Sequence, residues 1–276
     1  MKNVLVIVVT YNGMQWLDRC LGSVAQEADL YVWDNHSTDG SADFVATHYP
    51  QAMLTRSEQN VWFATPNNMG MRYAMRKGYK YVYLLNQDAW LFPGTLRTLV
   101  SAAEAHPDYA VLSPVQMTAD FQQLDPLFAK VYRLSGEDDV CRLRRVMAAH
   151  WLVPVQAIRE IGVFEEDLFP HWGQDDDWCN RARYHGMKIG VVSSAQAVHD
   201  RAYRRESKEK LIRRNYYNGS LVRLCDVNRP LLERFLFVCI FTLVKAIKYG
   251  SIQPFTYFQK LCHKLPRIRK HRRESR

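Results

Sequence analysis

Apolar and polar positions alternate along the first half of the chain in a way that predicts strands and helices in turn. Continuous apolar runs such as Val4–Val9 are typical of strands that are buried on both faces of a sheet. Between them, apolar residues recur every three or four positions, as in the predicted helix Met14–Gln26. This βαβα order predicts a largely parallel sheet with helices on both faces. The strands expected in this half are 4–9, 30–33, 53–55, 81–85 and 110–113, and the helices are 14–26, 41–48, 66–77 and 94–106.

The second half of the chain is less regular but carries further helical patterns. Residues 115–146 show no clear period, and we expect an antiparallel excursion there. A strand is predicted at Lys188–Val192. Leu231–Tyr249 predicts a strongly apolar helix, whose uninterrupted apolar run is too short to span a bilayer. The other helices are expected at 153–162, 175–185 and 207–225.

Polar residues follow three of the predicted parallel strands. They are Thr10–Asn12, Asp34–Asn35 and Asn86–Asp88. Ligands of open α/β sheets bind beyond the carboxyl ends of the strands. We therefore expect these three segments to contribute to one ligand site.

Two carboxylates at strand ends have both a functional and a structural interpretation. Asp34 can accept a hydrogen bond from the imide N–H of a uracil or thymine ring. Asp88 can share Mg²⁺ or Mn²⁺ with a pyrophosphate leaving group. Ordinary turn and helix-capping chemistry also accounts for acidic residues at such positions, without any ligand.

Three consecutive acids, Asp175–Asp177, form a further candidate. Adjacent carboxylates repel each other unless a cation or a substrate uses them. One acid in the first turn of a helix is favourable, but capping does not require three. Because a sugar acceptor needs a general base when its hydroxyl attacks an anomeric carbon, one of these acids is a candidate for that role. The flanking Trp172 and Trp178 indicate a cleft.

The positive charge of the chain is concentrated near its C-terminus. The formal net charge is +9, and residues 245–276 hold ten Lys and Arg against one acid, so the first 244 residues are neutral. A neutral body shows no electrostatic footprint for nucleic acid. Aromatic residues followed by a polybasic stretch suit an anionic membrane surface, and a solvated basic tail is the alternative.

The cysteines and the N-terminus bear on the compartment. Six cysteines without a CxxC pair argue against a zinc site and a disulfide scaffold, which suits a reducing environment. The apolar run at 4–9 is too short for a signal peptide and is better explained as a buried strand.

Several motifs stand in the order found in one enzyme family. Over roughly residues 4–225 the chain resembles the family 2 glycosyltransferases with the GT-A fold, particularly the branch of bacterial rhamnosyltransferases. It departs from the family pattern at Trp62, Thr65 and Pro66, where glycines are usual, and at Gln174, where Glu is usual. The segments that carry the resemblance are Val9-Thr10-Tyr11-Asn12, Asp34–Ser41, Asn60–Gly70, Asn86-Gln87-Asp88, Gly173–Arg181 and Ala197-Val198-His199.

The resemblance implies an α/β fold of GT-A type, with a mostly parallel, Rossmann-like central sheet flanked by helices and a C-terminal helical extension. The expected glycosyltransferase domain is 1–226. Its nucleotide-sugar-binding half is 1–114, and its acceptor and catalytic half is 115–226. Residues 227–276 then form an apolar helix and a polybasic tail for membrane-surface attachment.

The resemblance also implies roles for individual residues in an inverting transfer. Asp175 is expected to be the general base, with Asp177 as the second choice, and Asp88 and His199 are expected to hold Mn²⁺ or Mg²⁺. Arg204 and Arg205 are either further phosphate ligands or solvated charges. The residues expected to bind the nucleotide-sugar are Thr10, Tyr11, Asn12, Asp34, Asn60, Asn67, Asn86, Gln87 and Arg201.

The implied partners are a dTDP- or UDP-sugar donor and a glycan or lipid-linked acceptor. The setting is bacterial surface polysaccharide synthesis, such as that of lipopolysaccharide, at the cytoplasmic face of the inner membrane.

Three alternative functions can be compared with the sequence. A sugar-1-phosphate nucleotidyltransferase would place a Gly-rich loop and a basic residue after the first strand, and Thr10–Gln15 offers neither. Gln174 leaves open a catalytically inactive relative that binds the donor or a glycan. A nucleic-acid binder that uses the basic tail is opposed by the neutral body.

Overall fold

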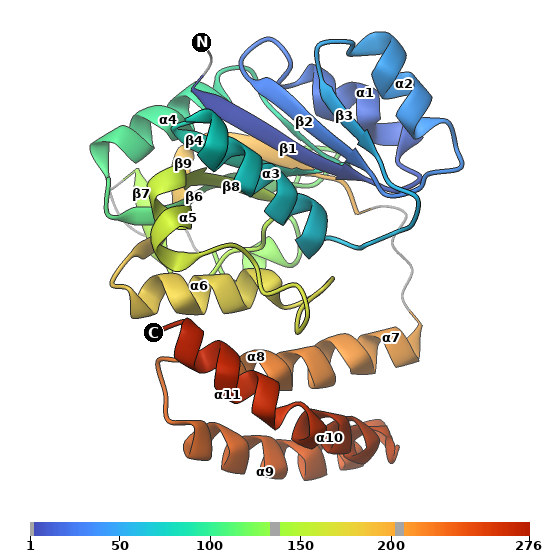
Figure 1. Ribbon diagram of the computed structural model, residues 1–276, viewed down its shortest axis with the longest axis vertical. Coiled ribbons are helices and arrows are strands. Elements are labelled where there is room, and N and C mark those ends of the chain that lie inside the picture. The colour runs from blue at the N-terminus through green and yellow to red at the C-terminus, as the bar shows by residue number, and fades with distance from the viewer. Residues whose placement is uncertain (1–2, 133–138, 202–206) are drawn as a thin grey trace.

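One mixed β-sheet of nine strands forms the centre of the protein (Figure 1). The structure is a computed structural model that describes residues 3–132, 139–201 and 207–276. The strand order across the sheet is β3-β2-β1-β4-β8-β6-β9-β5, and β7 pairs with β9. The strands are β1 (Val4–Thr10), β2 (Asp29–Asp34), β3 (Met53–Arg56), β4 (Tyr81–Asn86), β5 (Ala89–Leu91), β6 (Tyr109–Met117), β7 (Val140–Leu143), β8 (His150–Pro154) and β9 (Lys188–His199).

The two halves of the sheet differ in direction. In the first half, β1 pairs in parallel with β2 and β4, and β2 pairs in parallel with β3, as the βαβα pattern predicts. In the second half, β8 runs antiparallel to both β4 and β6, and β5 and β7 run antiparallel to β9. The parallel half therefore gathers the carboxyl ends of β1, β2 and β4 at one edge, where a ligand site is expected.

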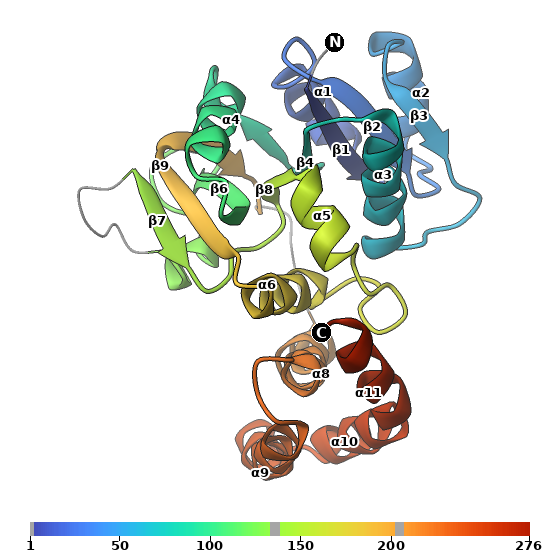
Figure 2. The same cartoon turned by 60° about the vertical axis from the view of Figure 1, so that its left-hand side comes forward.

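Helices cover both faces of the sheet (Figures 1 and 2). Alternate residues of β1 point to opposite faces, so Leu5 and Ile7 enter one apolar core while Val4, Val6 and Val8 enter the other. The first core includes α3, α5 and α6, and the second includes α1, α2 and α4. These helices are α1 (Met14–Gly22), α2 (Ser41–His48), α3 (Ala64–Lys77), α4 (Thr95–Ala105), α5 (Val155–Ile161) and α6 (Gln174–Tyr184).

The C-terminal part forms a separate helical layer below the sheet (Figures 1 and 2). A third apolar cluster joins Leu221 and Leu224 of α8 to Val238, Leu261 and Ile268 of the three helices that follow. The bounds are α7 (Lys208–Ile212), a π-helical segment (Arg213–Asn218), α8 (Gly219–Cys225), α9 (Leu231–Tyr249), α10 (Gln253–His263) and α11 (Leu265–Glu274). In the described part of the chain, no helix is both long and apolar enough to cross a bilayer.

Several predicted elements differ from those observed. The helix expected at 14–26 ends at Gly22, and the strand expected at 188–192 continues to His199. The start of the helix expected at 153–162 belongs to β8, because its apolar run pairs with β4 and β6. The polybasic stretch is not an irregular tail but the helix α11.

Candidate active site

The ends of β1 and β2 lie side by side and present a buried carboxylate. Thr10 and Asp34 are paired in register, and the backbone N–H of Asn35 donates to the Thr10 carbonyl over 2.8 Å. Asp34 Oδ2 accepts the backbone N–H of Ser37 at 3.0 Å. Asp34 Oδ1 is buried and has no hydrogen-bond partner among the described residues. An unsatisfied buried carboxylate oxygen is costly, so Asp34 Oδ1 is an acceptor suited to a ligand N–H.

The Gln87 side chain fixes the segment that follows β1 through three hydrogen bonds. Its Oε1 accepts from the Thr10 hydroxyl at 2.9 Å and from the Tyr11 backbone N–H at 2.7 Å, and its Nε2 donates to the Tyr11 carbonyl at 3.3 Å. Gly13 makes room for this amide, because a Cβ there would lie 2.4 Å from Gln87 Oε1. The ring of Tyr11 is 48% exposed. Gln87 therefore positions the segment, while Tyr11 keeps its ring available to a ligand.

The other predicted asparagines use their side chains to shape loops. Asn12 has a φ of 49°, and its Oδ1 accepts the backbone N–H of Thr38 at 2.9 Å. Asn60 Oδ1 accepts the backbone N–H two residues later at 2.9 Å, and the buried Asn67 donates to the carbonyl four residues earlier at 2.8 Å. Direct contact of these three residues with a donor stays a prediction.

Asn35 directly follows β2 and joins the end of that strand to the loop before α3. Its Oδ1 accepts the Val61 N–H at 3.2 Å, and its Nδ2 donates to the Trp62 carbonyl at 2.6 Å. The next two backbone N–H groups both donate to the Pro170 carbonyl over 3.0 Å, and the Trp62 and His171 rings lie 5.3 Å apart. The loop before α3 therefore contacts the loop that leads to α6.

Asp88 and His199 come together because β5 and β9 pair. Ala89 is opposite His199 in the ladder, and the Asp200 N–H donates to the Asp88 carbonyl at 2.8 Å. The two side chains are buried, with Asp88 Oδ1 3.5 Å from His199 Nε2. Residues more than one hundred positions apart thus place a carboxylate and an imidazole side by side.

A buried acid that the sequence argument missed, Asp125, supports this pair. Its Oδ1 accepts two backbone N–H groups of the following turn, and its Oδ2 accepts from the Arg201 guanidinium and lies 3.6 Å from His199 Nδ1. Arg201 also donates to Met147 Sδ at 2.9 Å. Arg201 Nη2 lies 3.3 Å from His199 Nδ1, so Asp125 acts on this imidazole by holding Arg201 beside it. A lone Asp in an irregular segment gives no sequence signal for this role. Arg204 and Arg205 lie outside the described residues.

His150 is a second buried histidine in this region. Its Nδ1 lies 2.9 Å from the Tyr83 hydroxyl and its Nε2 lies 2.9 Å from the Val198 carbonyl, so both ring nitrogens have partners. Burial lowers the pKa of His150 to about 3. The residue is therefore neutral and fixes the end of β9 next to His199.

The donor set at Asp88 and His199 fits a divalent ion. A carboxylate oxygen and a neutral imidazole nitrogen suit Mn²⁺, whereas Mg²⁺ prefers oxygen ligands. His199 ends β9 and Asp88 directly precedes β5, and the ladder between these two strands fixes their relative position. Asn86 ends the neighbouring β4, where its backbone N–H donates to the Ala149 carbonyl at 3.1 Å.

Asp175 lies in the first turn of α6 and is linked to this site through residues 148 and 149. Gly173, with a φ of 94°, precedes the helix, and a Cβ there would lie 2.9 Å from Val222. The Ala148 backbone hydrogen-bonds to the Asp175 carboxylate, and the next carbonyl accepts from Asn86. Burial and then the charge of Asp176 raise the pKa of Asp175 to about 7. Such a pKa suits a general base near neutral pH.

The structure corrects the expectation for Asp177. This side chain is buried, and its oxygens accept from Arg181 at 3.0 Å and from His271 at 2.9 Å. Burial lowers the pKa of His271, but Asp177 and Glu165 oppose this and raise it to about 9. Asp177 therefore joins α6 to α11 as a buried ion pair and has no oxygen free to act as a base. Cys225 approaches the same group, yet the Arg181 guanidinium opposes a metal ion there.

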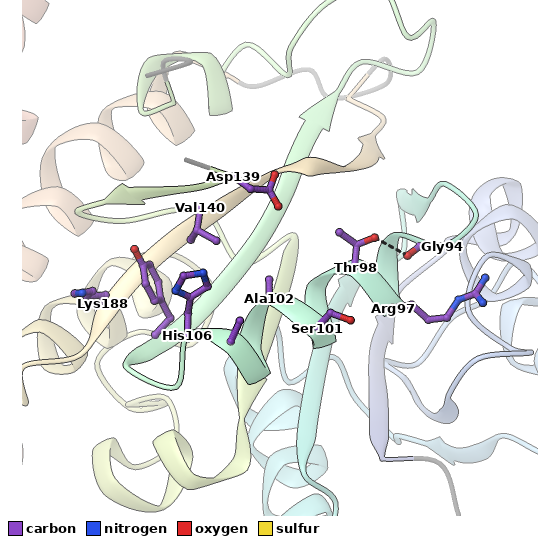
Figure 3. A pocket seen from close by; sticks show the side chains of 11 residues that line it. Gly94, Arg97, Thr98, Ser101, Ala102, His106, Asp139, Val140 and Lys188 are labelled. Carbon is purple, nitrogen blue, oxygen red and sulfur yellow. Dashed lines mark hydrogen bonds between the residues drawn. The ribbon is translucent and has the colours of Figure 1, made fainter. Parts of the chain in front are cut away.

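A surface hollow of about 900 Å³ lies elsewhere, along α4 and β9 (Figure 3). Its lining includes Arg97, His106, Asp139 and Lys188. None of the residues of the predicted site lines it. Lys188 is engaged in an ion pair with Asp108, and its Nζ lies over the ring of Tyr109. The hollow is therefore not the site described above.

A parallel half joined to a mixed half in one sheet, with helices on both faces, is the arrangement of the GT-A fold. Residues 5–133 match the family described as Glycosyl transferase family 2. The chain is a glycosyltransferase that carries a family 2 domain.

Comparisons with individual proteins agree with this assignment. The chain is 22% identical to the dTDP-rhamnosyl transferase RfbF of Shigella flexneri over 212 residues, which cover 72% of this chain and 69% of that protein. Its fold is similar to S. aureus TarS 1–349, with a TM-score of 0.59, 17% identity, and coverage of 86% of this chain and 69% of that one. It is also similar to GalNAc-T7 solved with UDP, GalNAc and Mn²⁺, with a TM-score of 0.62, 14% identity, and coverage of 93% and 54%.

Proposed function

We propose that the chain transfers a sugar from a dTDP- or UDP-linked donor to a glycan or lipid-linked acceptor in bacterial surface polysaccharide synthesis, with inversion at the anomeric carbon. Asp34 would hold the base, Asp88 and His199 would hold Mn²⁺ or Mg²⁺, and Asp175 would be the general base. The observation that carries the proposal is the buried Asp88–His199 pair, which lies at the sheet edge that also presents Asp34.

The donor is proposed to lie along the ends of β1 and β2. The buried Asp34 Oδ1 is suited to the imide N–H that uracil and thymine share, and the exposed ring of Tyr11 can stack on the base. Among the structural neighbours, S. aureus TarS was solved with UDP-GlcNAc, and RfbF is a dTDP-rhamnosyl transferase. Both nucleotides carry the imide that Asp34 would recognise.

Asp88 and His199 are proposed to anchor the diphosphate end through a divalent ion. When bound, the ion supplies charge neutralisation for the departing diphosphate. Arg201, which Asp125 orients, adds a guanidinium beside the same pair. The neighbouring GalNAc-T7 structure contains both UDP and Mn²⁺.

Asp175 is proposed to accept the proton of the acceptor hydroxyl. Attack from the side opposite the nucleotide inverts the anomeric carbon, and its rate depends on a base held next to the acceptor oxygen. The hydrogen bond from the Ala148 backbone fixes the Asp175 carboxylate. Among the described residues Asp176 pairs with Arg145 and Asp177 pairs with Arg181, whereas no ion pair within 4 Å holds Asp175.

Calorimetric titration with UDP and dTDP tests the donor site. We expect both nucleotides to bind wild-type protein with Mn²⁺ and to bind Asp34→Asn more than tenfold more weakly, since the amide presents a donor to the imide. The matched control is Asp43→Asn, an exposed acid of α2 that pairs with Arg56. Equal nucleotide affinity in Asp34→Asn and wild type would remove Asp34 from the site.

The acceptor is proposed to reach the site from a membrane, because α9 has an exposed apolar face. The helix spans about 28 Å, and its opposite side packs through the buried Val238 and Thr242. Exposed apolar patches of this kind mark interaction surfaces. The residues of the α9 face are Leu232, Leu236, Phe237, Ile240, Leu243, Val244 and Ile247.

Cations flank the α9 face on one side. Arg223 lies over the rings of Phe237 and Phe241, and Lys245 Nζ lies 4.9 Å from the Phe241 centroid. Partial burial lowers the pKa of Lys245, and so do the charges of Lys248 and Arg223. Among the described residues no carboxylate pairs with these three cations. An anionic lipid surface would satisfy both the apolar face and the cations.

The proposed membrane contact is this surface of α9 and not the polybasic stretch alone. Arg267 pairs with Glu165, while His271 and Arg272 are buried, and Arg272 donates to three backbone carbonyls. Arg267, His271 and Arg272 therefore serve to dock α11. The apolar face lies on α9, at the end of the molecule farthest from the sheet (Figures 1 and 2).

Flotation of the full chain with phosphatidylglycerol vesicles tests the membrane contact. Ile240→Ser/Ile247→Ser should lower the bound fraction at least tenfold, because both side chains are more than half exposed and the substitutions remove the apolar area that they would bury in the bilayer. Tyr184→Ser on α6 and Arg269→Gln/Arg273→Gln on α11 should float as wild type does. Equal flotation of the α9 variant would contradict the proposal, and concentration-dependent dimers that the α9 variant abolishes would assign the face to a second copy.

A further inference from the structure

An arginine-lined hollow adjoins the proposed base. Its volume is about 620 Å³, and it lies where α6, α8, the start of α9 and the segment after β7 meet. Two acids, Asp176 and Asp226, face six arginines across it. The arginines are Arg142, Arg144, Arg145, Arg183, Arg223 and Arg234.

The acids neutralise only part of this charge. Arg145 pairs with Asp176 at 2.7 Å, and Arg234 pairs with Asp226 at 2.9 Å. The other four arginines have no carboxylate partner in the part of the chain that the structure describes. Like charges held together in one hollow are unfavourable unless an anion is bound there.

Two of the arginines, Arg183 and Arg234, are not simply solvated surface charges. Arg183 is half-buried, and its Nε is buried without a hydrogen-bond partner among the described residues. Burial lowers the pKa of Arg183, and the charge of Arg144 adds to this. The Arg234 Nε is likewise buried and unsatisfied. Buried guanidinium donors of this kind need an acceptor, and phosphate oxygens match their geometry.

The hollow lies between the proposed base and the α9 face. Asp176 lines it and directly follows Asp175. On the other side, Arg223 lines it and stacks over Phe237 of the α9 face. A ligand with its phosphate in the hollow therefore has α6, which carries Asp175, on one side and the α9 face on the other.

We infer that this hollow binds the phosphate or diphosphate group of the acceptor, and so selects acceptors that carry a phosphate ester. The inference rests on the proposed function for the role of Asp175. A lipid-linked diphosphate and a soluble phosphate ester both carry the phosphate group that the arginines would bind. The experiment below distinguishes these two acceptors.

Calorimetric titration with inorganic pyrophosphate tests the site, with EDTA present so that the ion bound by Asp88 and His199 takes no part. We expect Arg144→Gln/Arg183→Gln to bind pyrophosphate at least tenfold more weakly than wild type, because each lost charge-assisted contact lowers affinity by about that factor. Arg142→Gln/Arg144→Gln changes only exposed side chains, so it tests the site even if the Arg183 variant does not fold. Arg97→Gln, in the other hollow, is the matched control and should bind as wild type does.

Unchanged pyrophosphate affinity in both double variants, or no pyrophosphate binding by wild type, would overturn the inference. Geranyl diphosphate identifies the source. If geranyl diphosphate binds more tightly than pyrophosphate, and Ile240→Ser/Ile247→Ser removes the difference, the acceptor is lipid-linked. If the two bind equally, the acceptor is a soluble phosphate ester. The same variants should bind UDP with Mn²⁺ as wild type does, so failure of the donor site and failure of this site are separate results.

Discussion

The pH dependence of donor turnover should follow the ionisation of Asp175. The pKa of this carboxyl is raised to about 7 by burial and by the charge of Asp176. A base must be deprotonated to act, so the active fraction rises from about one tenth at pH 6 to about nine tenths at pH 8. The rate should therefore rise about tenfold over this range, whereas an Asp with an ordinary pKa near 4 would give a flat profile.

Two neighbouring substitutions should move this profile in opposite directions. Asp176→Asn removes the charge that raises the pKa of Asp175, and the midpoint should fall by about one pH unit. At pH 6 this variant should then be about fivefold faster than wild type. Arg145→Gln removes a cation that lowers the pKa of Asp175, so its midpoint should rise. Both side chains are partly exposed, which limits any effect on folding.

The assay is the initial rate of nucleotide diphosphate release at saturating Mn²⁺ from pH 5.5 to 9. Asp175→Asn should lose at least a hundredfold in rate at pH 8. Ionisation at the metal site is common to all the variants and cannot produce opposite shifts. Identical midpoints in Asp176→Asn, Arg145→Gln and wild type, or a wild-type rate in Asp175→Asn, would refute the assignment of the base.

Three further substitutions test how the site is held in place. His271 has a pKa of about 9 beside Asp177. The protonated imidazole therefore adds about 3 kcal/mol to the free energy of unfolding below pH 6.5, and this contribution is lost as the pH rises through 9. In His271→Gln the free energy of unfolding from urea curves should no longer fall over this pH range. Gly13→Ala should weaken UDP binding in calorimetry and lower the free energy of unfolding by about 2 kcal/mol, because the new Cβ would displace the Gln87 amide. Asn68→Ala should cost about 2 kcal/mol in urea unfolding, since the buried amide makes three hydrogen bonds to the loop at 164–166.

The sequence predicted the parallel half of the fold well because its signals are local. Apolar runs bounded by polar turns located β1, β2 and β4, and the helices at 41–48 and 231–249 have the predicted bounds. The mixed half depends on pairings between distant residues. The short strand β5 exists only through its ladder with β9, and no local pattern indicates it.

The site divides in the same way. Asp34 and Asp88 follow strands and can be proposed from position alone, whereas the contacts of Asp125 and of Asn35 depend on the tertiary fold. Asp177 was misjudged because three adjacent acids look alike in sequence, although helical geometry turns one of them toward α11. In the basic stretch at the C-terminus, charge composition does not show that His271 and Arg272 are buried.

The most direct test of the central claim is a donor-turnover screen with wild-type protein and Asp88→Ala. Each protein would be incubated with UDP-, dTDP- and GDP-sugars in the presence of Mn²⁺, Mg²⁺ or EDTA. We predict metal-dependent release of one nucleotide by wild type, restricted to uracil or thymine donors, and its loss in Asp88→Ala. Absence of turnover and of binding for every donor with either metal would contradict the account and indicate an inactive relative in which Asp88 is only a turn residue.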